Sequence, residues 1–297
     1  MYKLSIIMPV HNEEESINDF YCELIKYIKI KESEIVFIDD GSDDNSLDIM
    51  KNLQKKDKRI KIIQFSKNFG QQAAIRAGLS YINGDVAIVM DADLQDHPKY
   101  IPELIEKWKS GYQVVFAKRR LRLDSFFKKA SVLIFYKILN LVASKIDSNV
   151  GDFYLLDKKA IEKINAFKKK TIFLRGFIQG LGFKQGKVLI DRDKRHKGKS
   201  SYSFLKMVRL GFDAFISLPR GLSRLILLLA IFILAMSSIF LFLFFQNLIA
   251  VTILIFILDI FQLFLLTILF IYLNYTIDEI RKKPLYITKN IYDPEDE

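Results

Sequence analysis

Short apolar runs alternate with amphipathic stretches along the first 120 residues of this 297-residue chain. The apolar runs are rich in Ile, Val and Phe and predict strands at 4–10, 34–38, 60–64, 85–90 and 114–117. Apolar residues at helical spacing predict helices at 14–28, 46–56, 71–81 and 102–109. Strands and helices that alternate in this way indicate βαβ units. We therefore expect an α/β domain whose sheet is mostly parallel.

Polar side chains follow three of these predicted strands. Asn12 and Glu13 come after the first strand, Asp39-Asp40-Gly41-Ser42 after the second, and Asp91-Ala92-Asp93 after the fourth. In sheets of this kind, ligands bind beyond the carboxyl ends of the strands. The three clusters therefore predict one binding site along one edge of the sheet.

Asp91 and Asp93 are candidate metal ligands. One residue separates the two carboxylates at the end of an apolar strand, so both can turn toward one divalent cation, and Gln95 can add another oxygen. Hard cations such as Mg²⁺ take oxygen ligands and usually keep phosphates and waters as well. An Asp-x-Asp tripeptide is a weak signal by itself, and its position at a strand end makes it stronger.

The acidic cluster after the second strand has two interpretations. An aspartate at position 40 can accept hydrogen bonds from a nucleobase or a ribose, and Gly41 allows close approach. Asp and Ser are also good helix N-caps. We expect a ligand contact from Asp40 and a capping role from Asp43 or Asp44.

The chain carries a net charge of +11, which indicates an anionic partner. Basic residues gather at 118–120 and across 192–199. Arginine suits phosphate because its guanidinium donates two parallel hydrogen bonds. The alternative is a solvated basic face beside anionic lipid. Since the basic residues accompany acidic metal ligands and apolar spans, we expect no nucleic-acid partner.

The hydrophobicity of the chain is concentrated after residue 220. Residues 225–245 and 248–272 are each long enough to cross a bilayer, which needs about 20 apolar residues. Their short connection predicts a hairpin, and basic residues on both flanks place those flanks in the cytoplasm. No signal peptide is apparent in the sequence. We therefore expect a multi-pass protein of the inner or plasma membrane with a cytoplasmic catalytic domain.

Two features of this region have open interpretations. Asp259 interrupts the second span, and a charge there is costly. We expect a helix–helix or oligomer contact, or a position that water reaches, rather than a transport role, for which two spans are too few. Residues 204–218 have apolar residues at helical spacing with Lys206 and Arg209 among them. This pattern fits a helix in the membrane interface, or an ordinary surface helix.

Four motifs resemble glycosyltransferase family 2. They are Pro9-Val10-His11-Asn12-Glu13, Asp39-Asp40-Gly41-Ser42-Asp43, Lys67-Asn68-Phe69-Gly70 and Asp91-Ala92-Asp93-Leu94-Gln95-Asp96. Within that family the chain is similar to polyprenyl-phosphate sugar synthases, both dolichyl-phosphate mannose synthases and bactoprenol glucosyltransferases, with further matches at 150–153, 195–200 and 283–287. The resemblance implies a GT-A fold, an inverting mechanism and a divalent metal, Mg²⁺ or Mn²⁺.

The resemblance also implies the substrates, a nucleotide sugar and polyprenyl phosphate. Asp152 fits the bactoprenol glucosyltransferase pattern better than that of the mannose synthases. We therefore expect UDP-glucose and undecaprenyl phosphate, in a pathway of surface-glycan modification. GDP-mannose, UDP-N-acetylglucosamine and a UDP-aminopentose are alternative donors. A homo-oligomer, such as a tetramer, and a flippase are further expected partners.

Individual residues receive roles from the same resemblance. The donor is expected to contact Pro9, His11, Glu13, Asp40, Ser42, Asp91 and Ala92. The metal is expected at Asp91, Asp93 and Gln95. The acceptor phosphate is expected at Arg119, Arg120, Lys128, Arg195, Lys199 and Ser200. Catalysis is assigned to Asp93, Asp152, Arg119 and Arg195, with Asp152 either a base or a positioning residue. Ser201 stands where the family usually has lysine, so Lys197 or Lys199 is expected to replace that contact.

The expected organisation has four parts: a GT-A catalytic domain at 1–203, an interfacial helix at 204–221, two transmembrane helices at 222–274 and a cytoplasmic tail at 275–297. A processive polysaccharide synthase is one alternative, but its Gln-x-x-Arg-Trp motif is missing, since Glu106-Lys107 precedes the single tryptophan, Trp108. A catalytically silent flippase partner is another alternative, and the intact metal-ligand motif argues against it.

Overall fold

The computed structural model describes residues 2–28, 32–120, 150–167, 174–191, 230–240, 248–280 and 284–294. The chain divides into two compact units, which are described separately. The first comprises residues 1–130, 146–207 and 284–297, and the second comprises 131–145 and 208–283. The helix predicted at 204–218 lies outside the described residues.

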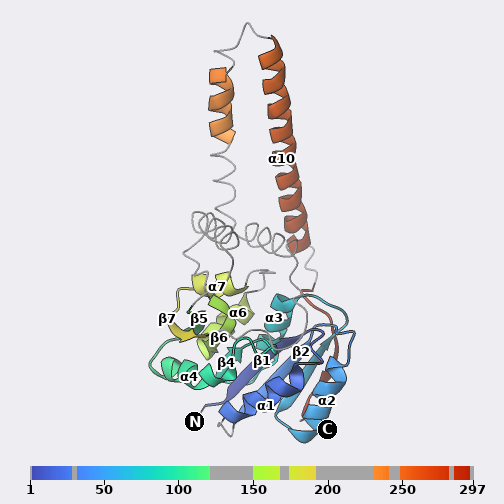
Figure 1. Ribbon diagram of the computed structural model, residues 1–297, viewed down its shortest axis with the longest axis vertical. Coiled ribbons are helices and arrows are strands. Elements are labelled where there is room, and N and C mark those ends of the chain that lie inside the picture. The colour runs from blue at the N-terminus through green and yellow to red at the C-terminus, as the bar shows by residue number, and fades with distance from the viewer. Residues whose placement is uncertain are drawn as a thin grey trace. The chain divides into compact units, whose positions relative to one another are not determined.

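An eight-stranded sheet forms the centre of the first unit, in the order β7-β5-β6-β4-β1-β2-β3-β8 (Figure 1). The four neighbours β4, β1, β2 and β3 run parallel, as do β5 and β7. Strands β6 and β8 run antiparallel to their neighbours. The strands are β1 (Leu4–Val10), β2 (Ser33–Asp39), β3 (Ile60–Phe65), β4 (Val86–Val89), β5 (Val114–Arg119), β6 (Val150–Asp157), β7 (Gln185–Ile190) and β8 (Thr288–Tyr292).

Helices cover both faces of this sheet and make a three-layer α/β/α unit. Side chains of α1 (Ile17–Tyr27), α2 (Ser46–Lys56) and α4 (Ile101–Lys109) pack on one face. Side chains of α3 (Gln71–Tyr81), α6 (Lys158–Ala166) and α7 (Leu174–Gly180) pack on the other. A short 3-10 turn, η1 (Pro98–Tyr100), leads into α4.

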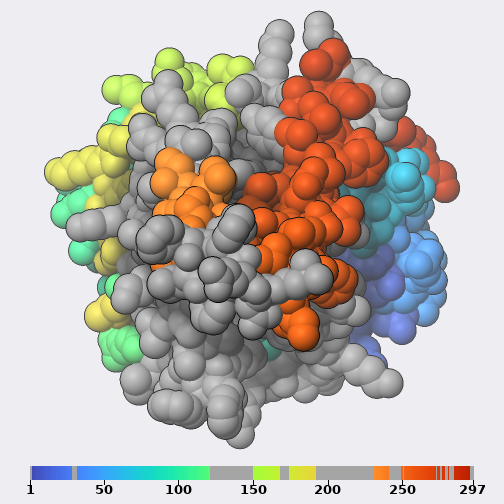
Figure 2. Space-filling view, turned by 90° about the horizontal axis from the view of Figure 1, so that it is seen from above, coloured from blue at the N-terminus to red at the C-terminus, as the bar shows by residue number. Residues whose placement is uncertain are grey.

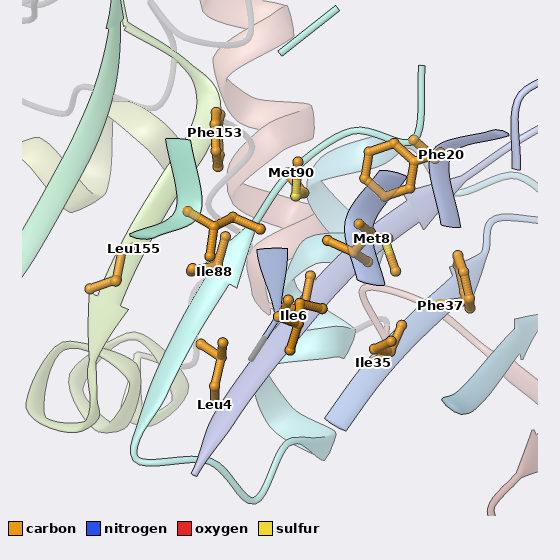
Figure 3. Packing of buried hydrophobic residues seen from close by; sticks show 14 of the residues in the cluster. Leu4, Ile6, Met8, Phe20, Ile35, Phe37, Ile88, Met90, Phe153 and Leu155 are labelled. Atoms are coloured by element: carbon orange, nitrogen blue, oxygen red, sulfur yellow. The ribbon is translucent and has the colours of Figure 1, made fainter. Parts of the chain in front are cut away.

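The central strand β1 shows how the sequence produces two cores. Leu4, Ile6 and Met8 point to the face covered by α1, and Phe20 of α1 lies beside Met8 (Figure 3). Ile7 points to the opposite face, where α3 lies. Alternation with a period of two divides side chains between the two faces of a strand. Because helices cover both faces, β1 is apolar throughout most of its length, as buried parallel strands are.

The predicted α/β fold with a mostly parallel sheet is confirmed. The helices at 46–56 and 71–81 have the predicted bounds, and the predicted strands differ from the observed ones only at their ends. The first helix begins at Ile17 rather than at residue 14, because residues 13–16 form a turn in which Ser16 N donates to Glu13 O at 3.0 Å. That turn lies beside the loop after β2.

Several features of the first unit were not predicted from the sequence. The turn at 149–153 was expected to lead into a short strand, but β6 begins at Val150, is eight residues long and lies between β4 and β5. Helices α6 and α7, which follow it, were not predicted. The chain also returns to the first unit after the apolar region, where β8 pairs with β3 at the edge of the sheet. Gln54 Nε2 donates to Tyr292 O at 2.8 Å, and the rings of Phe65 and Tyr286 stack with centroids 4.9 Å apart. The segment expected to be a tail therefore contributes a strand to the sheet.

The second unit contains α10 (Leu248–Ile280) and a shorter apolar helix, Ala230–Phe240. Within α10, Val251–Ile271 is long and apolar enough to cross a membrane, and it is the only such helix among the described residues. Ile249, Phe256 and Phe270 expose 73, 67 and 66% of their surfaces, and Figure 2 shows side chains of α10 in orange to red. Exposed apolar side chains in such numbers indicate a membrane or a partner. The first predicted span is described only at 230–240, so the two-span prediction stays a prediction.

Candidate active site

The loops after β1 and β2 hold each other by hydrogen bonds at the carboxyl edge of the sheet. Asn12 N donates to Ser42 Oγ at 3.1 Å, and Asn12 Oδ1 accepts from Asp43 N at 2.8 Å. Glu13 N donates to Ser46 Oγ at 2.9 Å. Asn12 has a φ of 56°, in the left-handed region that asparagine tolerates better than most residues. The Ser42 hydroxyl, predicted to contact a donor, thus helps to fix the shape of this edge.

Asp40 fastens a third loop to the same edge. Its Oδ1 accepts from Phe69 N at 2.6 Å and its Oδ2 from Gly70 N at 2.9 Å. The loop passes so close to Gly41, which has a φ of +64°, that a Cβ there would lie 2.4 Å from the carbonyl carbon of Lys67. Burial raises the pKa of Asp40, and the two backbone N–H groups oppose that shift. Asp40 therefore organises the site by holding the loop at 69–70.

Two buried polar atoms beside these loops have no hydrogen-bond partner among the described residues, His11 Nδ1 and Asp39 Oδ2. The other oxygen of Asp39 accepts from Ser42 N at 3.0 Å. A buried polar atom without a partner costs roughly 1–3 kcal/mol, so such atoms in native proteins call for an explanation. His11 and Asp39 also lie close enough to interact electrostatically. Both side chains are therefore available to a bound molecule, although the sequence predicted this only for His11.

The Asp-x-Asp motif forms a turn directly after β4. Asp93 Oδ1 accepts from Gln95 N at 3.0 Å, and Leu94 between them has a φ of 58°. That conformation is rare for leucine and is typical of functional turns. At the start of α3, Gln71 Nε2 donates to Asp91 Oδ1 at 2.6 Å. Both acids of the motif are thus held by hydrogen bonds.

The pairing of β4 with β6 brings a third carboxylate to the motif. Val89 pairs with Tyr154 in this antiparallel ladder. Continuing that register by two residues places Asp91 opposite Asp152. Burial raises the pKa of Asp91 well above its usual value, and the charges of Asp93, Asp152 and then Asp96 raise it further. The site therefore concentrates negative charge that a cation can relieve.

Arg119 brings a positive charge to this cluster. Its Nη2 donates to Asp96 Oδ2 at 2.8 Å in a largely buried ion pair, and its charge lowers the pKa of Asp91. Its Nε is buried and has no hydrogen-bond partner among the described residues. The guanidinium lies over Gly151, where a Cβ would be 2.7 Å from Nη2. Arg119 thus retains a donor for a further anion.

The donor set fits a hard divalent cation that is shared with a substrate. The carboxylates are oxygen ligands of the kind that Mg²⁺ and Mn²⁺ take. Within the described part of the chain, no group of three or more His, Cys, Asp or Glu residues is arranged to hold a metal. Mg²⁺ commonly takes part of its coordination from substrate phosphate and water.

The remaining predicted residues have varied positions. Pro9 lies in β1, and Ala92 is buried within the Asp-x-Asp turn. Glu13 Oε2 accepts from Ser16 Oγ at 2.9 Å near the start of α1. Arg120 is exposed and lies 3.8 Å from a carboxylate oxygen of Asp191. Four predicted acceptor-phosphate residues lie outside the described residues: Lys128, Arg195, Lys199 and Ser200.

Three residues of the site were not singled out from the sequence. Asp39 and Asp96 were seen only as members of acidic runs, and the acidic composition of those runs was their signal. Gln71 begins a helix and carries no motif of its own, so its contact with Asp91 depends on how α3 packs beside β4. The structure supplies that information and the sequence does not.

A mostly parallel sheet with helices on both faces and an Asp-x-Asp turn at its carboxyl edge defines the GT-A-like class of glycosyltransferases. The chain belongs to glycosyl transferase family 2, whose model matches residues 5–165.

Relatives of known name agree with this family. The chain is 43% identical over 213 residues to an uncharacterized glycosyltransferase of Bacillus subtilis, a match that covers 70% of this chain and 66% of that protein, just under two-thirds. It is 35% identical over 242 residues to the bactoprenol glucosyl transferase of Shigella phage SfX, covering 80% of this chain and 79% of that protein. The chain is therefore a glycosyltransferase.

Solved structures show the same fold. Glucosyl-3-phosphoglycerate synthase of Mycobacterium tuberculosis, in complex with Mn²⁺, UDP and phosphoglyceric acid, superimposes with a TM-score of 0.53 at 13% identity, covering 73% of this chain and 77% of that one. The same enzyme with Mn²⁺ and UDP-glucose gives a TM-score of 0.51 at 14% identity, covering 73 and 78%. At this level of identity the likeness concerns the fold alone.

Proposed function

We propose that this protein transfers glucose from UDP-glucose to polyprenyl phosphate, with inversion at the anomeric carbon and with Mg²⁺ or Mn²⁺. The observation that carries the proposal is the meeting of Asp91, Asp93 and Asp152 with Arg119 at the carboxyl edge of the sheet. The acceptor and the sugar are suggested by the relatives that are named bactoprenol glucosyl transferase.

The loops after β1 and β2 are the proposed site of the nucleoside. They contain the buried, unpartnered atoms of His11 and Asp39 and adjoin the loop that Asp40 holds. The diphosphate would then lie at the end of β4, next in the sheet. Asp91, Asp93 and Gln95 would hold the cation there, which when bound would supply positive charge to the diphosphate.

The proposed reaction needs no proton transfer to or from the protein. An oxygen of the acceptor phosphate is already anionic, so it can attack the anomeric carbon without losing a proton. The new carbon–oxygen bond forms as the bond to the diphosphate breaks, and the electron pair leaves with the nucleoside diphosphate. Arg119 would hold a phosphate near the developing charge. Asp152 would orient the sugar or the acceptor, since no base is required.

A membrane position for this reaction is supported by the apolar helix. Residues 251–271 of α10 are long enough to reach across a bilayer. We propose two spans with both flanks, the catalytic unit and the tail strand β8 in the cytoplasm, because β8 pairs with β3 of the catalytic sheet. A cytoplasmic catalytic unit would use the lipid phosphates of the cytoplasmic face of the membrane. We further propose the domain boundaries predicted from the sequence, a homo-oligomer and a flippase partner.

A donor panel tests the proposal. Purified full-length protein would be incubated with polyprenyl phosphate, Mn²⁺ and, in separate reactions, UDP-glucose, UDP-N-acetylglucosamine, GDP-mannose and a UDP-aminopentose. We expect lipid-linked glucose from UDP-glucose and little product from the others. Product from a different donor alone would correct the sugar. No lipid-linked monosaccharide from any donor would contradict the proposed function and favour a silent partner of another membrane protein.

A further inference from the structure

A buried hydroxyl beside the candidate site has no partner. Tyr154 on β6 is 0% exposed, and its Oη has no hydrogen-bond partner in the described part of the chain. Its ring packs against Phe116 with centroids 5.8 Å apart. A phenylalanine would fill the same space without burying a polar atom. The hydroxyl therefore costs stability in the resting protein, which calls for a functional reason.

The position of the hydroxyl connects it to Asp152. The two residues are separated by one residue on β6, so they share a face of the sheet with backbones about 7 Å apart. Burial raises the pKa of Tyr154 well above 10, and the charges of Asp152 and Asp91 raise it as well, while Arg175 opposes. The hydroxyl therefore keeps its proton and is a hydrogen-bond donor.

The neighbouring carboxylates differ in what they can accept. Asp91 Oδ1 already accepts from Gln71 at 2.6 Å. Asp152 Oδ1 is buried and, like Tyr154 Oη, has no partner among the described residues. One face of β6 thus holds an unmatched donor next to an unmatched acceptor. The terminal torsion of an aspartate is soft, which allows a contact between them to form without a movement of the strand.

We propose that Tyr154 is a positioning residue that donates a hydrogen bond to Oδ1 of Asp152 when substrates bind, and so holds that carboxylate in its working orientation. The proposal rests on the proposed glycosyl transfer, because Asp152 is given its role there. Tyr154 itself is too deeply buried to touch a substrate, so its effect passes through Asp152.

Removing the Tyr154 hydroxyl should change stability and activity in opposite directions, with a higher thermal midpoint and a lower kcat. Tyr154→Phe is expected to raise the thermal midpoint of the catalytic unit by a few degrees, because an unsatisfied polar atom is lost. The matched control is Tyr21→Phe, since Tyr21 Oη donates to Asp57 Oδ2 at 2.8 Å and its removal should lower the midpoint. Fluorescence of the single tryptophan, Trp108, reports on this unit in the full-length protein. A lower midpoint for Tyr154→Phe would show that the hydroxyl is already bonded at rest and would overturn the proposal.

Activity would be measured with UDP-glucose, polyprenyl phosphate and Mn²⁺. Tyr154→Phe is expected to lower kcat about tenfold or more and to leave KM for UDP-glucose nearly unchanged. Tyr21→Phe should leave both constants unchanged. In an Asp152→Ala background, which has no side-chain acceptor and is assayed with long incubations, adding Tyr154→Phe should have no further effect, since the two act as a unit.

An unchanged kcat for Tyr154→Phe, or an equal further loss in the Asp152→Ala background, would contradict the positioning role. These outcomes presuppose a wild-type protein that forms lipid-linked sugar. If the wild type forms none, the proposed function fails instead, and the thermal midpoints still report whether the Tyr154 hydroxyl is unsatisfied.

Discussion

Asp40 and Asp91 follow two parallel strands at the same edge of the sheet, yet the groups that surround the two carboxylates differ. Burial raises the pKa of both. Asp40 is compensated by two backbone N–H groups, from Phe69 and Gly70. Asp91 has one amide donor, and three further carboxylates raise its pKa more. The first acid is satisfied within the protein, whereas the second belongs to a cluster that needs positive charge from outside. Asp40 therefore has a structural role in holding a loop of the site, whereas Asp91 and the carboxylates around it are proposed to bind the cation and the substrate.

The largest loss of activity is expected from substitutions in the carboxylate cluster of Asp91, Asp93 and Asp152. Asp93→Asn keeps the shape of the side chain and removes its charge, so we expect kcat to fall about 100-fold or more. The thermal midpoint should stay the same or rise, because the substitution relieves repulsion. Transfer rates and tryptophan fluorescence measure the two effects. Asp48→Asn, at an exposed position of α2, is the control. A stability loss that matches the activity loss would place Asp93 with Asp40 as a structural acid.

Gly151→Ala tests the position of Arg119 without changing any charge. The new Cβ would lie 2.7 Å from Arg119 Nη2 and 3.1 Å from Cζ, so the guanidinium that bonds Asp96 has to shift. Misplacing a phosphate-binding group is expected to lower kcat/KM about tenfold to a hundredfold. Gly180→Ala is the matched control, since a Cβ there meets nothing within 4 Å. Equal activities of the two variants would argue against a role for Arg119 near the reaction.

For Asp40 we expect the opposite pattern, in which stability is lost more than activity. Asp40→Asn replaces one acceptor oxygen by a donor that faces a backbone N–H, so we expect a stability loss of about 1–3 kcal/mol. Chemical denaturation followed by Trp108 fluorescence would measure it. Activity measured well below the unfolding transition should fall less than in Asp93→Asn. A stable but inactive Asp40→Asn would show that Asp40 acts mainly on the ligand.

Because the pKa of Asp40 is raised in the folded protein, the stability lost in Asp40→Asn should depend on pH. A carboxyl whose folded pKa lies above its unfolded value of 3.8 stabilises the fold most when it is protonated. This contribution declines as the pH rises through the unfolded pKa toward the raised folded pKa. The stability difference between wild type and Asp40→Asn should therefore be larger near pH 4 than at pH 7. A difference that grows with pH would contradict the assigned cause.

The smallest effect is expected at Arg120. Its ion pair with Asp191 is exposed and 3.8 Å long, so Arg120→Ala should change stability by no more than about 0.5 kcal/mol. If Arg120 contacts the acceptor phosphate, KM for polyprenyl phosphate should rise several-fold while KM for UDP-glucose is unchanged. No change in either constant would remove Arg120 from the acceptor site.

The sequence predicted the strands and helices of the catalytic unit because their patterns are local. β1 is apolar along its length, and the acidic runs directly follow β2 and β4. It did not predict that β6 would lie between β4 and β5 and bring the charge of Asp152 close to Asp91. Nor did it predict β8, whose pairing with β3 joins residues more than 200 positions apart, as the 2.9 Å bond from Asn290 to Gln64 illustrates. Long-range pairing depends on the whole fold, which no local pattern encodes.

The acceptor is the most direct test of the account. Full-length protein with UDP-glucose and Mn²⁺ would be given polyprenyl phosphate or the corresponding polyprenol, and the lipid products would be identified by mass spectrometry. The account predicts a polyprenyl-phosphate hexose from the first lipid, no glycosylated product from the second, and loss of the product in Asp93→Asn. Glycosylation of the polyprenol at a comparable rate, or product formation that survives Asp93→Asn, would contradict it.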